Sequence, residues 1–290
     1  MTFSSCCRVT APLLFSLLAM AGCGGVGHDV ADVVGAMADG IVCGLRNCTE
    51  SSTLNVDEIS PRFSAAQATG DNRVVVDGFL GKSANVLTTV LMAPDERLSV
   101  SVDGGPEVTM SNPDGERLGY TASLAAASAQ PVVQLVFTRA GVRHVSQVTL
   151  PVGFTVLQPT GNPLLTRSGA ALPVRLNLSG VNDAVATGSG SCSRSDGSSF
   201  TIKNENLGAR IEGSVAGGYR LEPALVDDNL NIASRNANNS DPKTAAVSRC
   251  ELTVTWTKSS RGTIAPTMNG HGTFLGERQA SHPLVYDARS

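Results

Sequence analysis

Apolar and polar residues alternate with a period of two from Arg73 onwards, and this pattern restricts the fold of the 290-residue chain more than any other feature. The clearest example is the segment Cys250–Trp256, which reads Cys-Glu-Leu-Thr-Val-Thr-Trp. Successive side chains of a β-strand point to opposite faces, so the Cys, Leu, Val and Trp share one face and the polar residues share the other. The segment is therefore predicted to be a strand with one buried face.

Short strands separated by turns are predicted between Arg73 and Pro151. Asp103-Gly104 stands where a hairpin turn belongs, Asn112-Pro113-Asp114-Gly115 is a second turn signal, and Gly141 is a third. The predicted strands are Val74–Val76, Val86–Met92, Leu98–Val102, Val108–Met110, Tyr120–Leu124, Val133–Phe137 and Val148–Leu150. About seven short strands in some 80 residues are typical of a β-sandwich.

A second series of strands begins near Phe154. Its clearest members are Leu172–Leu178, Phe200–Ile202, Tyr219–Val226 and Cys250–Trp256. The two series together predict an all-β fold with two tandem β-sandwich domains, at residues 71–152 and 153–290.

The predicted buried face of Cys250–Trp256 carries a cysteine and a tryptophan, and in this it resembles the core of an immunoglobulin-like domain. The resemblance covers residues 70–287 and implies that both sandwiches are immunoglobulin-like modules, which bacterial envelope proteins often carry in tandem. In immunoglobulin domains the tryptophan lies between the two cysteines of the disulfide, whereas Trp256 follows the second cysteine. The topology of the strands is therefore left open.

The first residues fit a secretory signal peptide, with one early cation, Arg8, and an apolar stretch from Ala11 to Ala21. This stretch is well short of the ~20 apolar residues that a membrane-spanning helix needs. The run Leu17-Leu18-Ala19-Met20-Ala21-Gly22-Cys23 resembles the lipobox of a bacterial lipoprotein precursor. The resemblance implies that residues 1–22 are removed and that Cys23 carries the lipid. The alternative is an ordinary signal peptide cut near Ala21, which leaves Cys23 as a free thiol.

Lipidation of Cys23 implies a location in the cell envelope. Two or more acyl chains anchor a protein stably, whereas a single chain gives only marginal binding. In Gram-negative lipoproteins an Asp after the lipidated cysteine is the signal for retention in the inner membrane, so Gly24 implies the outer membrane. The membrane is thus the first predicted partner, on either the periplasmic or the outer side.

Charge argues against nucleic acid as a partner. Removal of residues 1–22 takes away Arg8 and no acidic residue, so the formal net charge moves from −3 to −4. A nucleic-acid-binding protein is expected to carry a strongly basic patch, and this chain has no such cluster in its sequence.

Four cysteines remain after Cys23, and an even number suits two disulfides in an oxidising compartment. They are Cys43, Cys48, Cys192 and Cys250. Three pairings are possible, and Cys43–Cys48 with Cys192–Cys250 is the simplest because each pair lies within one segment. In a chain-entropy description the longer loop stabilises by about 4 kcal/mol and the shorter by about 2 kcal/mol. Neither pair has Cys-x-x-Cys spacing or a flanking histidine, so no metal is expected.

The segment 23–70 is predicted to hold the lipidated end, a short helix and a tether. Apolar residues recur at helical spacing from Val26 to Leu45, and aspartates lie off that stripe. Helices on membrane surfaces usually carry Lys and Arg on the polar face, so we expect this acidic helix to pack against the protein. The small, polar residues from Thr49 to about Gly70 favour a tether.

No catalytic or cofactor-binding motif stands out. None of the histidines lies in a metal-ligand or triad pattern; they are His28, His144, His271 and His282. Gly188–Cys192 lacks the Gly-x-Ser-x-Gly elbow, and Gly81-Lys82-Ser83 lacks the earlier glycine of a phosphate loop. Asp227–Asn231 and Asn236–Asp241 offer oxygen ligands for calcium, but Asn and Asp also cluster in turns.

These observations predict a non-catalytic envelope lipoprotein without a cofactor, whose immunoglobulin-like domains present loops or strand edges to an envelope or surface protein. Two alternatives remain open. One is a surface adhesin that contacts glycans or host proteins, although sugar-binding modules usually need exposed aromatic rings. The other is a hydrolase whose site is assembled from residues distant in the sequence.

Overall fold

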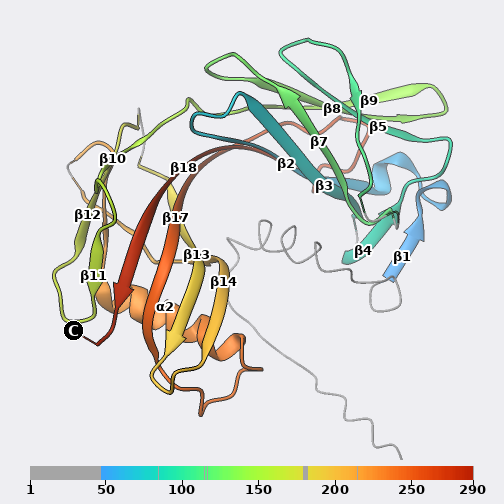
Figure 1. The fold of residues 1–290 in the computed structure, drawn as a ribbon. Helices are drawn as coiled ribbons and strands as arrows, with labels where there is room; N and C mark the ends of the chain where they lie inside the picture. The colour runs from blue at the N-terminus through green and yellow to red at the C-terminus, as the bar shows by residue number, and fades with distance from the viewer. Residues whose placement is uncertain are drawn as a thin grey trace, which may run out of the picture.

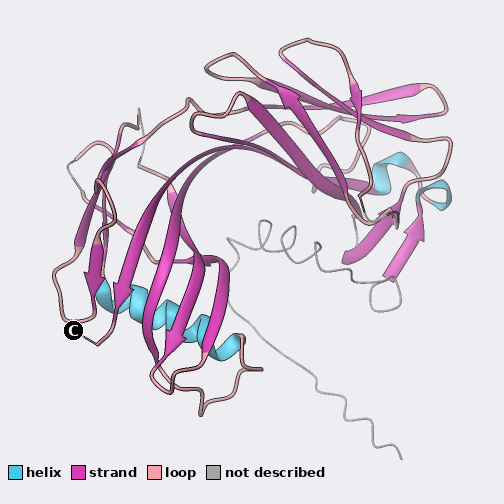
Figure 2. Cartoon of the chain, in the orientation of Figure 1, coloured by secondary structure: helices cyan, strands magenta, loops and turns pink. Residues whose placement is uncertain are grey.

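A computed structural model describes residues 47–83, 85–113, 115, 117–178, 182–213 and 215–289. Cys23, Cys43 and the expected helix over residues 26–45 lie outside this part of the chain. Within it, the fold is all-β apart from the helix α2 (Pro223–Asn236) and the 3-10 turns η2 (Ser51–Thr53) and η3 (Val56–Glu58), as Figure 2 shows.

A ten-stranded sheet, here the main sheet, runs through both halves of the described chain (Figure 1). Its order is β1 (Asn47–Glu50), β4 (Asn85–Leu91), β3 (Arg73–Lys82), β2 (Ile59–Ala68), β18 (Thr273–Asp287), β17 (Val247–Arg261), β13 (Val185–Arg194) and β14 (Ser199–Asn206). Two further strands pair with members of this order, β7 (Tyr120–Ala125) with β3 and β11 (Leu164–Thr166) with β18.

Two smaller sheets cover one face of the main sheet. The first cover sheet has the order β6 (Val108–Thr109), β5 (Arg97–Val102), β8 (Val132–Arg139) and β9 (Val142–Thr149). The second has the order β10 (Val156–Gln158), β12 (Leu172–Leu176), β16 (Gly218–Leu221) and β15 (Arg210–Ile211). The helix α2 contacts β14 and β17 of the main sheet. The predicted turn at Gly141 is confirmed, since Ala140 and Gly141 both have positive φ and link β8 to β9 as a two-residue hairpin turn.

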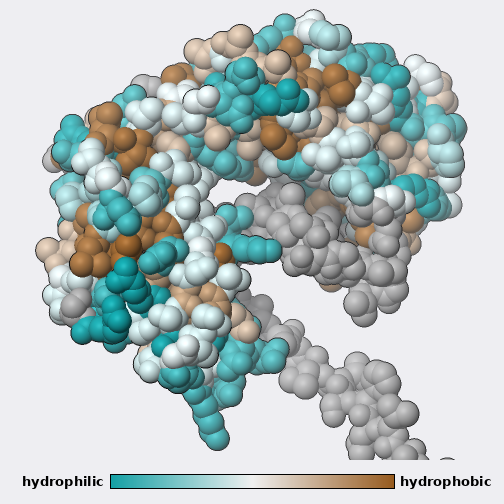
Figure 3. Space-filling model, viewed as in Figure 1, coloured by the Kyte–Doolittle hydropathy of each residue, from teal (hydrophilic) through white to brown (hydrophobic). Residues whose placement is uncertain are grey.

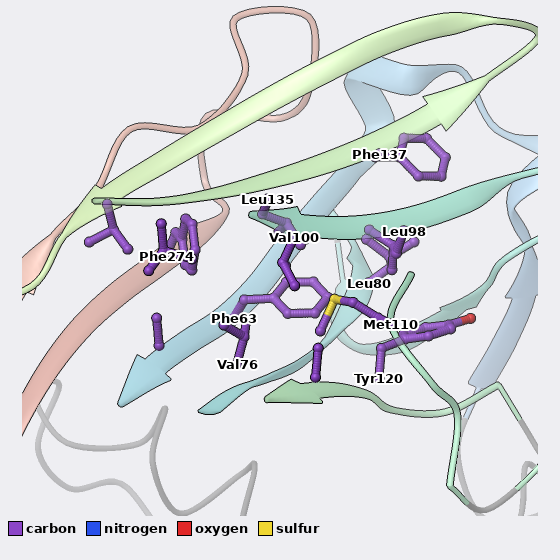
Figure 4. Packing of buried hydrophobic residues seen from close by; sticks show 14 of the residues in the cluster. Phe63, Val76, Leu80, Leu98, Val100, Met110, Tyr120, Leu135, Phe137 and Phe274 are labelled. Atoms are coloured by element: carbon purple, nitrogen blue, oxygen red, sulfur yellow. The ribbon is translucent and has the colours of Figure 1, made fainter. Parts of the chain in front are cut away.

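Two separate hydrophobic cores lie between the main sheet and its covers. The first contains Phe63, Leu98 and Leu135, whose side chains meet between β2, β5 and β8 (Figure 4). The second is centred on Trp256, which is fully buried and lies 4.9 Å from Tyr219 between ring centroids. The predicted all-β fold with two sandwiches is confirmed.

The strand β18 belongs to both sandwiches. It pairs with β17 in antiparallel register along nearly its whole length, from Leu275 opposite Arg261 to Asp287 opposite Arg249. On its other side it pairs in parallel with β2 over Thr273–Gln279 and with β11 over Val285–Asp287. The two sandwiches therefore share one sheet, and a linker is not their only connection.

The loop between β17 and β18 closes the open end of the first sandwich. Ala265 and Met268 are buried in the first core. Thr263 and Gln147 exchange two backbone hydrogen bonds of 2.8 and 2.9 Å, which fixes the loop against β9. The first core thus takes residues from the last tenth of the chain, and the domain limits 71–152 and 153–290 stay a prediction.

Arg278 ties β18 to the first sandwich and to the segment that joins the two sandwiches. Its side chain is buried, and its Nε donates to the carbonyl of Pro151 at 3.0 Å while its Nη2 donates to that of Ala129 at 2.8 Å. Nη1 donates to the side chain of Gln67 on β2. Burial lowers the pKa of Arg278, and the three acceptors offset the cost of removing its charge from water.

The expected tether from Thr49 to Gly70 is wrong. Ile59–Ala68 form the central strand β2, with Phe63 and Ala65 pointing into the first core. The small residues of this segment conceal the strand, because few of its buried positions carry a large apolar side chain.

A buried ion pair fixes the turns that precede β2. Arg139 pairs with Glu96, whose side chain is 2% exposed. The same guanidinium donates to the carbonyls of Ser51 at 2.8 Å and Leu54 at 2.9 Å. Residues 51–58 are therefore part of the first sandwich.

The predicted strand over Tyr219–Val226 is wrong in its second half. Tyr219 lies in β16, but α2 begins at Pro223. Val226, Leu230 and Ala233 are buried at helical spacing against the second core. Proline at the first turn of a helix needs no hydrogen-bonded N–H, which allows the helix to begin directly after the strand.

Replacement of Met268 by Ala should lower the free energy of unfolding by about 2–5 kcal/mol, because it leaves a cavity in a core that the loop closes. Urea unfolding of both proteins measures the difference. The control is Ile232→Ala on α2, where the side chain is 46% exposed and the expected change is below about 0.5 kcal/mol. Equal effects of the two substitutions would show that the loop does not close the core.

Candidate interaction surface

The side of the main sheet that faces away from both cores forms the inner surface of an arch (Figure 1). Strand alternation places the odd-numbered residues of β17 and β18 on this side. We call it the concave face. Its hydroxyl and amide side chains include Ser64, Thr121, Ser123, Thr187, Ser189, Ser191, Thr253, Thr255, Thr257, Ser259, Gln279 and Ser281.

Hydroxyl groups of neighbouring strands contact one another on the concave face. The hydroxyls of Thr255 and Ser281 are 2.9 Å apart, and Arg73 donates through Nε to the Ser123 hydroxyl at 2.8 Å. Thr253, Ser259 and Ser281 are exposed. The side of the molecule seen in Figure 3 mixes polar residues with several apolar patches. The face can therefore donate and accept hydrogen bonds over both sandwiches.

No Trp or Tyr ring that could stack on a sugar lies on the surface of the described residues. The chain has one tryptophan and three tyrosines, and all four are buried. They are Trp256, Tyr120, Tyr219 and Tyr286. The expectation that Trp256 is a core residue is confirmed, and no Trp or Tyr ring is available to a glycan.

One carboxylate lies near the middle of the concave face. Glu277 is half-buried, opposite Ser259 on β17 and Ala66 on β2. Burial raises the pKa of Glu277, while a hydrogen bond of 3.3 Å from Gln279 acts in the opposite direction. Among the described residues, Glu277 is not part of any group of three or more side chains that could hold a metal ion.

Two outer strand edges are protected against pairing with another chain. On β14 a bulge interrupts the register with β13, and Asn204 in that bulge has a φ of 54°. Bulges twist an edge away from an approaching strand. On β9 the backbone of Gln147 is already paired with Thr263. The strand edges expected to bind a partner are thus partly blocked at these two places.

Two hollows flank the segment that joins the sandwiches. One, of about 410 Å³, is lined by Gln130, Thr149, Leu150, Pro151, Val152, Gly153, Phe154, Leu178, Lys258, Ser259 and Ser260. The other, of about 570 Å³, is lined by Ala68, Thr69, Thr155, Val156, Pro159, Thr160, Gly161, Gln279, Ala280, Ser281, His282 and Pro283. The second lies beside the part of β18 between Gln279, where pairing with β2 ends, and Val285, where pairing with β11 begins.

The histidines do not assemble a reaction centre in the described chain. His144 contacts the Thr267 hydroxyl at 2.6 Å through Nδ1, but it is buried beside Phe137, with ring centroids 5.9 Å apart. Burial and the nearby Arg139 cation lower the pKa of His144. A general base of the triad type is instead oriented by a carboxylate, so this contact is structural.

The two candidate calcium stretches serve other purposes. Asp227 accepts hydrogen bonds from Arg167 at 2.7 Å and from the hydroxyl of Tyr286. The side chain of Asn231 accepts a hydrogen bond of 2.9 Å from the backbone N–H of Val247. The side chain of Asp241 accepts one from the backbone N–H of Lys243, which closes a turn. No group of three or more metal-binding side chains occurs among the described residues.

The predicted disulfide between Cys192 and Cys250 is confirmed. The two cysteines stand directly opposite each other on β13 and β17, with Cα atoms 4.1 Å apart. The bond lies within one sheet, whereas the immunoglobulin disulfide joins two sheets. Cys48 is also disulfide-bonded, and its predicted partner Cys43 lies outside the described residues.

Sequence comparisons give no relatives: no family model and no curated protein matches the chain. Among the helices that the structure describes, none is long and apolar enough to cross a bilayer.

Several solved structures have a low similarity to this chain. They include a chimeric titin Z1Z2 protein (12% identity, 81% of this chain and 100% of that chain, TM-score 0.22) and the Yersinia pseudotuberculosis adhesin InvE (12% identity, 78% and 60%, TM-score 0.22). The tandem Ig repeats of Dlar match with 10% identity over 79% of this chain and 99% of that chain, with a TM-score of 0.27. At these scores the likeness carries no argument about function.

Sequence reasoning missed both the concave face as a continuous surface and the hollow beside β18. One signal pointed to the hollow: Pro283 lies within a strand, and proline in a sheet marks a position without a ladder hydrogen bond. Nothing in the sequence pattern around Arg278 indicated that this residue lies buried at the junction of the two sandwiches.

The free energy of unfolding should fall as the pH decreases from 7.5 to 5.5. Burial lowers the pKa of both His144 and His282, so the unfolded chain, with histidine pKa near 6.5, binds more protons in this range. Glu277, whose pKa is raised, acts in the opposite sense at the lower end. Urea unfolding at several pH values tests this. The double variant His144→Gln, His282→Gln should show a smaller loss, and an unchanged slope would contradict the assignment.

Proposed function

We propose that the chain is a lipid-anchored protein of the bacterial cell envelope that binds a partner protein and catalyses no reaction of its own. The observation that carries the proposal is the single exposed concave face that spans both sandwiches. A partner can contact this face over its whole length without any movement between the two halves, which limits the entropy lost on binding.

The anchor in this proposal is the lipid on Cys23, after removal of residues 1–22. The disulfide between Cys192 and Cys250 supports a location outside the cytoplasm, because disulfides persist in oxidising compartments. Gly24 favours the outer membrane, on its periplasmic or its outer side.

A protein is a better partner for this surface than a glycan. Hydroxyl and amide groups supply hydrogen bonds, but all Trp and Tyr rings are buried. If the chain is a surface adhesin, its ligand is accordingly a protein and not a glycan. A hydrolase gains no support from the buried His144–Thr267 contact.

Photo-crosslinking in intact cells tests partner binding. A crosslinking amino acid at Thr253 on the concave face should give a discrete adduct with one envelope protein. The matched control is the same amino acid at Ile232, which is exposed on α2 outside the arch. Repeated failure at Thr253, or the same adducts at both positions, would overturn the proposal.

Mass spectrometry of the mature N-terminus tests the anchor. An acylated Cys23 is expected, and Cys23→Ala should move the protein to the detergent-free fraction. An unacylated N-terminus at another residue would contradict lipidation while leaving partner binding untouched.

A further inference from the structure

One stretch of β18 has no paired strand on the side of β2 and β11. The carbonyl of Gln279 still accepts the N–H of Thr69 at 2.7 Å, and the N–H of Val285 donates to the carbonyl of Pro163 at 2.9 Å. Pairing with β2 ends at Gln279 and pairing with β11 starts at Val285. Residues 280–284 therefore border a gap in the main sheet, which the hollow of about 570 Å³ occupies.

The backbone groups that face this gap follow from strand geometry. Alternate residues of a strand direct their N–H and C=O to the same side. The backbone groups of Gln279 and Val285 point towards β2 and β11. The backbone groups of Ser281 and Pro283, which lie between them at the same alternation, therefore point into the gap. Proline has no N–H, so Pro283 leaves no unpaired donor there. Ser281 presents both a donor and an acceptor.

The side chain of His282 also lies at the gap. Its Nδ1 donates to the carbonyl of Pro283 at 2.8 Å, and since that carbonyl points into the gap, the imidazole lies on the same side. With its proton on Nδ1, the neutral ring has an acceptor at Nε2. His282 is only 6% exposed, and its Nε2 is buried without a hydrogen-bond partner. Buried polar atoms are nearly always paired, so this atom marks a place for a donor.

The hollow has the size and character of a binding site for an uncharged ligand. Its volume falls within the range of about 300–1,000 Å³ that is usual for ligand pockets. Its lining combines hydroxyl groups of Thr69, Thr155 and Thr160 with small apolar side chains, and it contains no Asp, Glu, Lys or Arg.

We infer that this gap binds a short, extended, uncharged peptide segment of the partner protein. The peptide main chain donates to the carbonyl of Ser281 and accepts from its N–H, as in the addition of a strand to a sheet edge. A peptide N–H or a side-chain hydroxyl donates to Nε2 of His282. Six residue steps separate Gln279 from Val285, about 20 Å at ~3.3 Å each, so three to five residues fit between β2 and β11. This inference rests on the proposed binding function and names the segment that the partner contributes.

A capped tripeptide, N-acetyl-Thr-Val-Thr amide, serves as the probe, with the full mature chain observed by amide NMR. Saturable shifts of the Ser281 and His282 amides are expected. Ser281→Pro removes the N–H that faces the gap and should weaken binding about tenfold. Ser281→Ala keeps that N–H and should change binding less than threefold. His282→Phe keeps a ring without the acceptor and should weaken binding about two- to tenfold. Unchanged Trp256 fluorescence verifies that each variant is folded.

Absence of shifts in the native chain, or equal binding by the Ser281→Pro and Ser281→Ala variants, would overturn the inference. D-glucose at the same concentrations is the competing probe, and equal saturable shifts with it would assign the gap to a hydroxylated small molecule instead. The crosslink from Thr253 separates the two proposals. If that adduct persists in Ser281→Pro cells with unchanged yield, the partner binds the concave face without using the gap.

Discussion

The pairing of β18 with strands from both halves is the interaction on which the rest of the structure depends. The β17–β18 hairpin contributes Phe274 to the first core and Trp256 and Tyr286 to the second. Its loop closes the first sandwich, and Arg278 ties the junction to the carbonyl of Pro151. Neither core is complete without this hairpin, so we expect the two sandwiches to fold and unfold as one unit.

This shared sheet also determines what the molecule can bind. Because the covers and α2 occupy one face, the other face is left as a continuous, hydroxyl-rich surface. Hydroxyl groups alone are weak contributors to protein interfaces, in which a few well-packed side chains carry most of the free energy. The gap beside Ser281 and His282 supplies a recessed place within this surface, where main-chain pairing gives both affinity and direction.

The local pattern of apolar and polar residues predicted individual strands well. It did not predict which strands pair with one another. Alternation in Cys250–Trp256 predicted the strand, its buried face and the burial of Trp256, and the disulfide was the simplest pairing. Pairing of β2 with β18 joins opposite ends of the described chain and has no local signal. The helix α2 was missed although Pro223 and the spacing of its apolar residues indicated it, because β-forming residues and Asn-rich turns surround it.

Equilibrium unfolding in urea, followed by one probe in each core, tests most directly whether the two sandwiches unfold together. The fluorescence of Trp256, the only tryptophan, reports the second core, and amide NMR signals of Val133 and Leu135 in β8 report the first. A sheet shared by both cores predicts coincident midpoints for both probes, as expected for a single cooperative transition. A first core that stays folded after the tryptophan signal is lost, or the reverse, would contradict it.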